Sequence, residues 1–381
     1  MTSSEEGPSN LLIVAGEASG DLHGSLLLRE LRTRRPSVKA FGLGSDQLRA
    51  EGCELVADSR EIAVVGLTEA LRILPRAKQI FRQLLDEVER RDIRTAVLVD
   101  FPEFNLRLAR QLHRRGVRVI YYISPQIWAW RRRRVEQVRR TVHTMLVLFP
   151  FEVDFYRRFG VEVQHVGHPL VDEVPALPQV WERDPATERR VLALLPGSRR
   201  SEVSALLPKM LESAALLVED HALEIRLIEA PSVEEELFDE ILAGSSLEVH
   251  RIKERRFEAI ASSHLALCAS GTATLEVGLL GTPMVVLYQL SRVSYFLAKL
   301  LVDLPHFALV NLVLDQRAVP ELIQAEASEV AATASPLLNR GSELDAVLEA
   351  LGGVRQALGA GGASGRAAEA VIAAAGWEEK G

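Results

Sequence analysis

The stretch Leu11–Asp21, which reads LLIVAGEASGD, decides the fold class that we expect. Five aliphatic residues predict a strand, and the small residues after it lead into an amphipathic segment that predicts a helix over 22–35. Such a loop permits a tight turn, and the helix start offers free N–H groups to an anion or hydroxyl. Asp21 can also act only as a helix cap. The candidate ligand contacts here are Gly16, Glu17, Ser19, Gly20 and Asp21.

The same alternation of short aliphatic runs and amphipathic stretches continues along the 381 residues, which exceed one ordinary domain. We therefore predict an α/β protein with two Rossmann-like, doubly wound domains. The predicted strands are 11–15, 38–42, 95–99, 117–122, 144–148 and 163–166, then 191–195, 224–228, 247–250, 264–268 and 284–287. The proline-rich stretch around 171–190 indicates a linker, which gives domains at 1–170 and 191–345 and a C-terminal helical tail at 346–381.

The charge is distributed unevenly between the two halves. Residues 1–180 hold 27 Lys and Arg against 23 Asp and Glu (net +4), whereas residues 181–381 hold 18 against 29 (net −11). This balance argues against general nucleic-acid binding and leaves room for an anionic ligand or membrane surface on the first half. The acidic start and the two cysteines, Cys53 and Cys268, favour a protein of the reducing cytoplasm without a signal peptide.

Two carboxylates follow the predicted strand 95–99. Asp100 and Glu103 stand three residues apart, where a parallel strand opens toward a ligand, and Phe101 and Phe104 can raise a carboxyl pKa by excluding water. The pair therefore suits general base catalysis. The alternative is that Asp100 and Asn105 cap turns while Glu103 is solvated.

The segment Tyr122–Arg134 combines Ser124 and Trp128 with four consecutive arginines, Arg131 to Arg134. Tryptophans can form platforms for a sugar, and arginine can clamp a phosphate. Successive helical side chains point in different directions, so at most two of these arginines can share one ligand.

Two loops of the second half also join a strand to a helix. Gly197, Ser198 and Arg199 suit a phosphate, as do Ser270, Gly271 and Thr272, and Glu276 can accept hydrogen bonds from ribose hydroxyls. No Walker lysine, no D-x-D pair and no ligand-spaced histidine cluster is present, so we expect neither a metal nor a cofactor. The apolar, arginine-containing stretch Ile62–Val88 is either a core helix or a helix that lies on an anionic membrane.

Together these stretches resemble the lipid-A-disaccharide synthase family, bacterial glycosyltransferases of GT-B architecture, in which two Rossmann-like domains face a central cleft. The resemblance rests on the segments Val14–Asp21, Pro102–Asn105, Tyr122–Arg131, Val166–Pro169, Leu194–Arg199, Ala269–Glu276 and Pro320–Gln324. It implies transfer of diacylglucosamine from UDP-2,3-diacylglucosamine to 2,3-diacylglucosamine 1-phosphate, with inversion, to give a β(1→6) disaccharide 1-phosphate and UDP. It also implies a peripheral enzyme on the cytoplasmic face of the inner membrane, and favours the membrane interpretation of Ile62–Val88.

The resemblance further implies roles for individual residues. The proposed base of the family is the Asp of Pro-Asp-Phe-Asn, which is Glu103 here, so Asp100 is the reserve candidate. Arg199 and the 270–272 loop stabilise the leaving UDP, and Asn311 and Glu321 are further candidate contacts. Which of Arg131 to Arg134 meets the acceptor phosphate stays open, and a homodimer is compatible with the sequence.

Two other functions compete with this interpretation. A hydrolysing UDP-N-acetylglucosamine 2-epimerase would use the same nucleotide loops without a lipid acceptor or the apolar stretch Ile62–Val88. A non-catalytic, membrane-associated sugar-nucleotide-binding protein would follow if the Asp-to-Glu change at Glu103 had cost activity.

Overall fold

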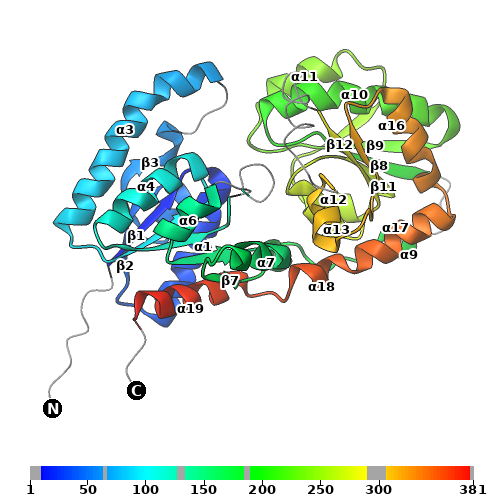
Figure 1. The fold of residues 1–381 in the computed structure, drawn as a ribbon. Helices are drawn as coiled ribbons and strands as arrows, with labels where there is room; N and C mark the ends of the chain where they lie inside the picture. The colour runs from blue at the N-terminus through cyan, green and yellow to red at the C-terminus, as the bar shows by residue number, and fades with distance from the viewer. Residues whose placement is uncertain are drawn as a thin grey trace. The chain divides into compact units, whose positions relative to one another are not determined.

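The computed structural model describes residues 10–62, 67–125, 127, 134–183, 189–289 and 306–377, with residues 67–72 and 182–183 described by their backbone alone. The described chain forms two compact units. Unit 1 comprises residues 1–169 and 361–381, and unit 2 comprises residues 170–360. Each unit is an α/β sandwich around its own parallel sheet (Figure 1).

Unit 1 is built on a parallel sheet whose strand order is β3-β2-β1-β4-β5-β6-β7 within the described residues. The direction of winding reverses between β1 and β4, which pair in register from Leu11 opposite Thr95 to Ala15 opposite Val99. The strands are β1 Asn10–Ala15, β2 Lys39–Gly44, β3 Glu54–Asp58, β4 Thr95–Val99, β5 Arg118–Tyr122, β6 Thr144–Val147 and β7 Val163–His165.

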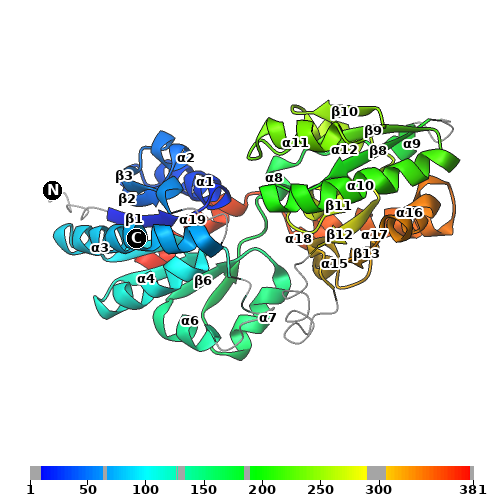
Figure 2. The same cartoon turned by 90° about the horizontal axis from the view of Figure 1, so that it is seen from above.

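Helices cover both faces of this sheet, because right-handed crossovers on either side of the reversal place helices on opposite faces. Helices α3, α4 and α6 lie on one face, and α1 and α19 lie side by side on the other (Figures 1 and 2). The bounds are α1 Ala18–Arg34, α2 Asp46–Ala50, η1 Ser59–Glu61, α3 Leu67–Arg90, α4 Pro102–Arg114, α6 Val135–Thr141, α7 Pro150–Arg158 and α19 Ala363–Ala375.

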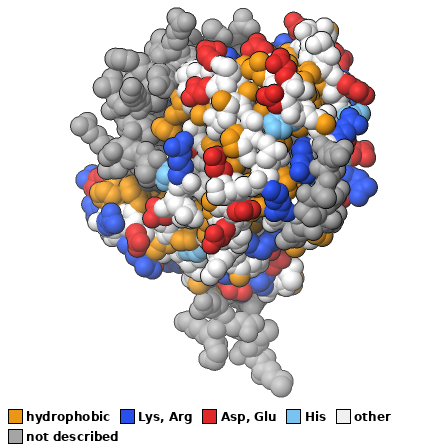
Figure 3. Space-filling view, turned by 90° about the vertical axis from the view of Figure 1, so that its right-hand side faces the viewer, with side chains coloured by type: hydrophobic (Ala, Val, Ile, Leu, Met, Phe, Trp, Pro, Cys, Tyr) orange, Lys and Arg blue, Asp and Glu red, His pale blue; other side chains and the backbone are white. Residues whose placement is uncertain are grey.

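Unit 2 repeats this plan with the strand order β10-β9-β8-β11-β12-β13, again all parallel among the described strands. The winding reverses between β8 and β11. The strands are β8 Arg190–Leu195, β9 Leu223–Ile228, β10 Val249–Ile252, β11 Leu265–Ala269, β12 Met284–Tyr288 and β13 Glu321–Ile323. The helices are α8 Leu170–Glu173, α9 Val180–Arg183, α10 Arg200–Asp220, α11 Glu235–Leu242, α12 Arg256–Ala261, α13 Ala273–Leu279, α15 Leu309–Leu314, α16 Ala327–Ala334, η3 Ser335–Leu338, α17 Ser342–Gly352 and α18 Val354–Leu358. On the face that Figure 3 shows, acidic and basic side chains are interspersed.

The prediction of two doubly wound α/β domains is confirmed, with local corrections. The edge strands β3 and β13 were not predicted, because they are short and each begins with a glutamate. Helix α1 begins at Ala18 rather than at residue 22, with Glu17 as its N-cap residue. The segment predicted as a linker contains α8 and α9, and Trp181 of α9 is buried and donates to the His264 carbonyl at 3.0 Å.

The apolar residues of α3 lie in two different environments, the core of unit 1 and the surface. Ile80, Leu84, Leu85 and Val88 are buried in the core of unit 1, so the membrane interpretation is wrong for this end of the helix. Leu74, one turn or more before them, is 44% exposed. Among the described residues, no helix combines the length and apolar character needed to span a membrane.

The C-terminal helix α19 belongs to unit 1, although the rest of the second half forms unit 2. Its buried face consists of small residues, which allow close approach to α1 and β5. Arg35 and Arg118 of unit 1 donate to the carbonyls of Trp377 and Ala374, so polar contacts fix the end of the helix as well.

Replacing Ala368, which is fully buried in α19, by glutamate should destabilise unit 1 by roughly 3 kcal/mol, because an unpaired carboxylate would be buried. Hydrogen exchange measured by mass spectrometry should show faster exchange in α1 and β5 and unchanged exchange in α10. The exposed Ala373 of the same helix is the matched control, and equal exchange in Ala368→Glu and Ala373→Glu would contradict the assignment.

Candidate active site

The carboxyl ends of β1 and β4 meet at the reversal point of unit 1, where ligands of doubly wound sheets bind. Immediately after β4, Asp100 and Phe101 both adopt positive φ values, 44° and 49°. Two consecutive left-handed non-glycine residues are unfavourable unless the surrounding structure holds them. The end of β4 is therefore a constrained turn that presents the Asp100 side chain.

Hydrogen bonds to the Asp100 backbone hold this turn. Its N–H donates to the Tyr122 carbonyl at 2.9 Å, and its carbonyl accepts from Tyr121 Oη at 2.6 Å and Asn105 Nδ2 at 2.8 Å. The Asn105 amide also donates to the Val99 carbonyl at 3.2 Å and is fully buried. Asn105, predicted as a ligand contact, is therefore a support for the turn.

Gly16, at the end of β1, makes room for the same turn. A Cβ atom at this position would lie 2.1 Å from Cδ1 and 2.3 Å from Cγ of the Phe101 ring, well inside van der Waals contact. Phe101 in turn stacks on Phe104 with ring centroids 5.7 Å apart. Gly16, in the loop after β1, thus leaves room for the Phe101 ring of the turn after β4, and this ring covers the end of β1.

Burial raises the pKa of the Asp100 carboxyl to about 6, and the negative charge of Glu17 adds to this rise. Glu17 and Ser19 are exposed at the start of α1, whereas Gly20 is buried behind them. The loop after β1 and the turn after β4 therefore bring two carboxylates to one edge of the sheet. A carboxylate whose pKa lies near 6 can accept a proton at neutral pH.

Glu103 has different surroundings, although it lies only three residues further along. Its carboxylate forms a two-pronged ion pair with Arg134, at 2.9 Å to Nη1 and 3.0 Å to Nη2. Its side chain is 57% exposed. The guanidinium of Arg134 is engaged by Glu103, and Arg131 to Arg133 lie outside the described residues, as does Trp128.

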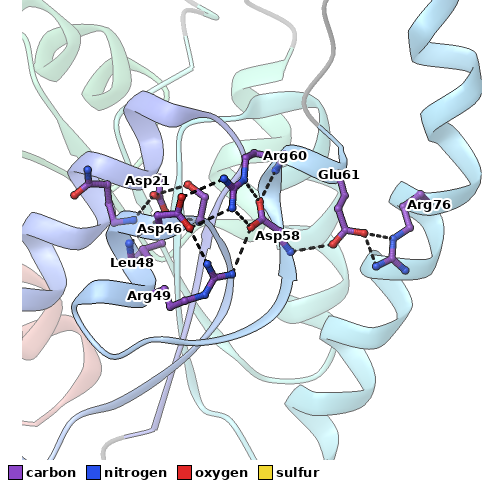
Figure 4. Close-up of polar contacts among 10 residues, drawn as sticks. Asp21, Asp46, Leu48, Arg49, Asp58, Arg60, Glu61 and Arg76 are labelled. Atoms are coloured by element: carbon purple, nitrogen blue, oxygen red, sulfur yellow. Dashed lines mark hydrogen bonds and ion pairs between the residues drawn. The ribbon is translucent and has the colours of Figure 1, made fainter. Parts of the chain in front are cut away.

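Asp21, another predicted ligand contact, is a structural residue. Its carboxylate is buried and accepts hydrogen bonds from the N–H groups of Ser45 and Gln47 and from Ser45 Oγ, at 2.6, 3.0 and 2.7 Å. It therefore caps α2 from within α1, and not the start of its own helix. Figure 4 shows Asp21 beside an ion-pair network in which Arg60 bridges Asp46 and Asp58.

Ser124 follows β5 after Ile123, whose φ of 67° is a further left-handed outlier at the same sheet edge. The Ser124 hydroxyl is buried and lies 2.7 Å from Tyr156 Oη and 3.0 Å from the Pro125 carbonyl, to which it donates. Its polar group thus fixes the loop after β5.

In unit 2 the reversal point lies between β8 and β11, and both predicted phosphate loops occupy it. Gly197, with φ of 110°, leads to the exposed Ser198 and Arg199. Glu202 Oε2 accepts from the N–H groups of both, at 3.1 and 3.3 Å, and Arg199 Nη1 donates to Glu202 Oε1 at 2.8 Å. Glu202 therefore orients this loop and its arginine.

The second loop, 270–272, stands at the end of β11. A Cβ atom at Gly271, whose φ is 154°, would meet none of the described atoms within 4 Å. Ser270 donates its N–H to the Leu287 carbonyl at 2.9 Å, and Thr272 is exposed. Glu276, one turn into α13, is paired with Arg256 Nη2 at 3.1 Å, and its side chain is 16% exposed.

Asn311 and Glu321, predicted as nucleotide contacts, instead bind each other and the backbone. Asn311 is fully buried, donates to the Val319 carbonyl at 2.9 Å and accepts from the Val319 N–H at 3.0 Å. Glu321 accepts from the Phe307 N–H at 2.8 Å. These two side chains therefore hold in place the segments that precede and begin β13.

Three residues of the site were not predicted from the sequence. Tyr121 lies inside a predicted strand, and no sequence signal distinguishes it from its apolar neighbours. Glu202 stands three residues after Arg199, which is the spacing of a capping box and could have identified it. Arg256 ends a run of four charged residues, Lys253–Arg256, which indicates only surface. Within the described ranges, no group of three or more His, Cys, Asp or Glu residues could hold a metal ion.

Solved structures share this fold at low sequence identity. Acinetobacter baumannii MurG gives a TM-score of 0.59 at 14% identity, over 96% of this chain and 100% of that one. The S. aureus MnaA–UDP co-structure gives 0.63 at 11% identity, over 96% of both chains. These similarities identify the fold as the GT-B type.

Sequence relatives are much closer. The lipid-A-disaccharide synthase of Myxococcus xanthus (strain DK1622) is 41% identical over 378 residues, covering 96% of this chain and 97% of that protein. The lipid-A-disaccharide synthase of Anaeromyxobacter sp. (strain K) is 43% identical over 370 residues, covering 95% and 96%. The family model described as lipid-A-disaccharide synthetase matches residues 11–348. The chain therefore belongs to the lipid-A-disaccharide synthase family and is a glycosyltransferase of lipid A biosynthesis.

Proposed function

We propose that this protein transfers diacylglucosamine from UDP-2,3-diacylglucosamine to 2,3-diacylglucosamine 1-phosphate. The products are the β(1→6)-linked disaccharide 1-phosphate and UDP. The observation that carries the proposal is that each unit places predicted site residues at its own sheet reversal. Unit 1 presents a half-buried carboxyl group with a raised pKa there, and unit 2 presents two phosphate-type loops followed by a carboxylate.

The donor nucleotide is assigned to unit 2. The exposed Arg199 and the N–H groups of Gly271 and Thr272 suit a diphosphate, and Glu276 suits the hydroxyls of a ribose. One of the solved structures with this fold is a complex with UDP, which supports a nucleotide of this kind. Charge that develops on the leaving diphosphate would be stabilised by Arg199 and these amides.

The acceptor is assigned to unit 1, with Asp100 as the base. Asp100 takes the proton from the acceptor 6-hydroxyl as that oxygen attacks the anomeric carbon from the face opposite UDP. The bond from this carbon to the diphosphate oxygen breaks, and its electron pair leaves with UDP, so the configuration inverts. Glu103 is a less suitable base, because its carboxylate is held by a guanidinium.

Incubation of the purified protein with both lipid substrates in detergent should yield one disaccharide 1-phosphate for each UDP released. Release of UDP without the acceptor would instead indicate a hydrolysing, epimerase-like enzyme. UDP binding without either product would indicate a binding protein. Each of these two outcomes would overturn the synthase assignment.

Asp100→Asn should lower kcat by about 10³-fold, because it removes the base but keeps a residue type that tolerates the left-handed turn. Glu103→Gln should lower it less than about tenfold, because an exposed ion pair contributes little. The kcat/KM of the native protein should fall as the pH drops through about 6, where Asp100 becomes protonated. Near-normal turnover of Asp100→Asn together with an inactive Glu103→Gln would reverse the assignment.

Stability gives an independent check on the same side chain. The folded protein holds the Asp100 proton more tightly than the unfolded chain, so ionisation costs stability as the pH rises from 3.8 to about 6. At pH 8 the Asp100→Asn variant should therefore be more stable to urea by roughly 3 kcal/mol, and at pH 4 the difference should be small. A loss of stability of Asp100→Asn at pH 8 would show instead that the ionised Asp100 carboxylate stabilises the fold.

We further propose that α3 contacts an anionic membrane surface around the exposed Leu74. Leu74 is 44% exposed and is followed closely by Arg76 and Lys78, as in helices that combine apolar insertion with attraction to anionic lipid. Phe81 is excluded from this surface, because its ring packs edge-on against Phe104 at 5.5 Å.

Leu74→Ser should weaken binding to vesicles that contain anionic lipid by about tenfold, because an inserted leucine contributes on the order of 2 kcal/mol. Co-sedimentation with such vesicles measures this. Leu216→Ser, which changes a leucine that is 39% exposed on α10 of unit 2, is the control. Equal binding of the two variants would remove Leu74 from the membrane surface.

A further inference from the structure

Two carboxylates in unit 2, Glu276 and Glu173, interact electrostatically with one arginine, Arg256. Glu276 of α13 is hydrogen-bonded through Oε1 to Nη2 of Arg256, the first residue of α12, at 3.1 Å. Glu276 is mostly buried, whereas the Arg256 side chain is 43% exposed. Removing Arg256 would therefore be unfavourable, because it would leave the negative charge of the mostly buried Glu276 without compensation.

The second carboxylate is Glu173, the last residue of α8, which packs against α13. Its Oε1 atom is buried and has no hydrogen-bond partner among the residues that the structure describes. Helix α8 is fixed in place by Arg355 of α18, which donates to the carbonyls of Val171 and Val174 at 3.0 Å each. Glu173 is thus held close to the site by its backbone.

The pKa values of Glu276 and Glu173 depend on burial and on the neighbouring charges. Burial raises the pKa of Glu276, the charge of Glu173 raises it further, and Arg256 lowers it. Burial also raises the pKa of Glu173, which Arg256 lowers and Asp172 raises. Burial and the charge of Glu276 raise the pKa of the Cys268 thiol in β11, which therefore stays neutral. Arg256 is the cation that acts on both glutamates.

We propose that Arg256 is a positioning residue for the donor nucleotide: it offsets the charge of Glu173 and keeps Glu276 an ionised acceptor for the ribose hydroxyls. The proposal rests on the proposed function, which assigns the nucleotide to this loop. A carboxylate accepts two hydroxyl hydrogen bonds, whereas its protonated form has lost part of that capacity. Nucleotide affinity therefore depends on the charge state of Glu276, and through it on two residues that need not touch the ligand.

Fold stability alone does not account for the cluster. One arginine beside two shielded carboxylates leaves an excess negative charge, and ion pairs of this kind seldom stabilise a protein more than apolar residues of similar size. A buried acceptor oxygen without a donor is likewise unfavourable in a structural cluster. The excess negative charge is expected where a ligand with hydroxyl donors binds to Glu276.

Titration of UDP into the full-length protein by calorimetry between pH 5.5 and 8.5 tests the proposal. Arg256→Gln should bind UDP about tenfold more weakly at pH 7, as for a lost bond to a charged group, and should recover affinity as the pH rises. Glu173→Gln should bind as tightly as the native protein and keep its affinity to lower pH. The double variant should regain most of the affinity lost in Arg256→Gln.

Two further variants are controls for a change in folding. Arg256→Lys keeps the positive charge and should keep the native pH profile. Arg255→Gln removes the neighbouring arginine, which pairs with Glu258 at 3.2 Å and is 79% exposed, and should leave UDP binding unchanged.

The outcomes separate this inference from the proposed function. If the native protein binds UDP and Glu276→Gln weakens binding, but Arg256→Gln matches Arg255→Gln at every pH, the positioning role is wrong. An Arg256→Lys profile that follows Arg256→Gln would also overturn it. If the native protein binds no UDP, the assignment of the nucleotide to unit 2 fails, and this inference fails with it.

Discussion

The left-handed turn at Asp100 and Phe101 is the constraint on which the proposed chemistry depends. Two adjacent positive φ values are maintained because the Asp100 backbone bonds to Tyr121, Tyr122 and Asn105. The ring of Phe101 fits only because Gly16 has no side chain. The turn therefore connects the ends of β1, β4 and β5. It holds the Asp100 carboxyl group where partial burial raises its pKa.

The two units use the same topology for different electrostatic purposes. At the reversal of unit 1, burial makes a carboxylate more basic, which suits proton removal. At the reversal of unit 2, Arg199 and Arg256 stand beside Glu202 and Glu276. There each guanidinium is hydrogen-bonded to a carboxylate and orients it, which suits binding of a nucleotide rather than proton transfer.

Much of the fold could be predicted from the sequence, because buried parallel strands are nearly continuous aliphatic runs. The strands that escaped prediction, β3 and β13, lie at sheet edges where polar residues interrupt such runs. The candidate loops also lie together at the two sheet reversals, since the carboxyl ends of parallel strands gather at one edge of the sheet.

The roles of single polar residues were harder to predict. Asp21, Asn105 and Asn311 stand in ligand-type motifs, yet Asp21 and Asn105 bind the backbone of segments distant in sequence and Asn311 binds the backbone of Val319. Asp100 and Glu103 are both carboxylic acids in the sequence, and only the structure shows that Asp100 is half-buried with a raised pKa and that Glu103 is exposed and paired with Arg134. Such differences depend on tertiary neighbours, which local spacing does not encode.

The central claim is that the turn after β4 creates an unusually basic carboxyl group at Asp100. Carbon-13 NMR of the side-chain carboxyl, followed as a function of pH in the ligand-free protein, measures this directly. The account predicts a midpoint near pH 6 that moves down in Glu17→Gln, because Glu17 contributes to the raised pKa. A midpoint near 3.8, the ordinary value of an aspartate, would contradict it.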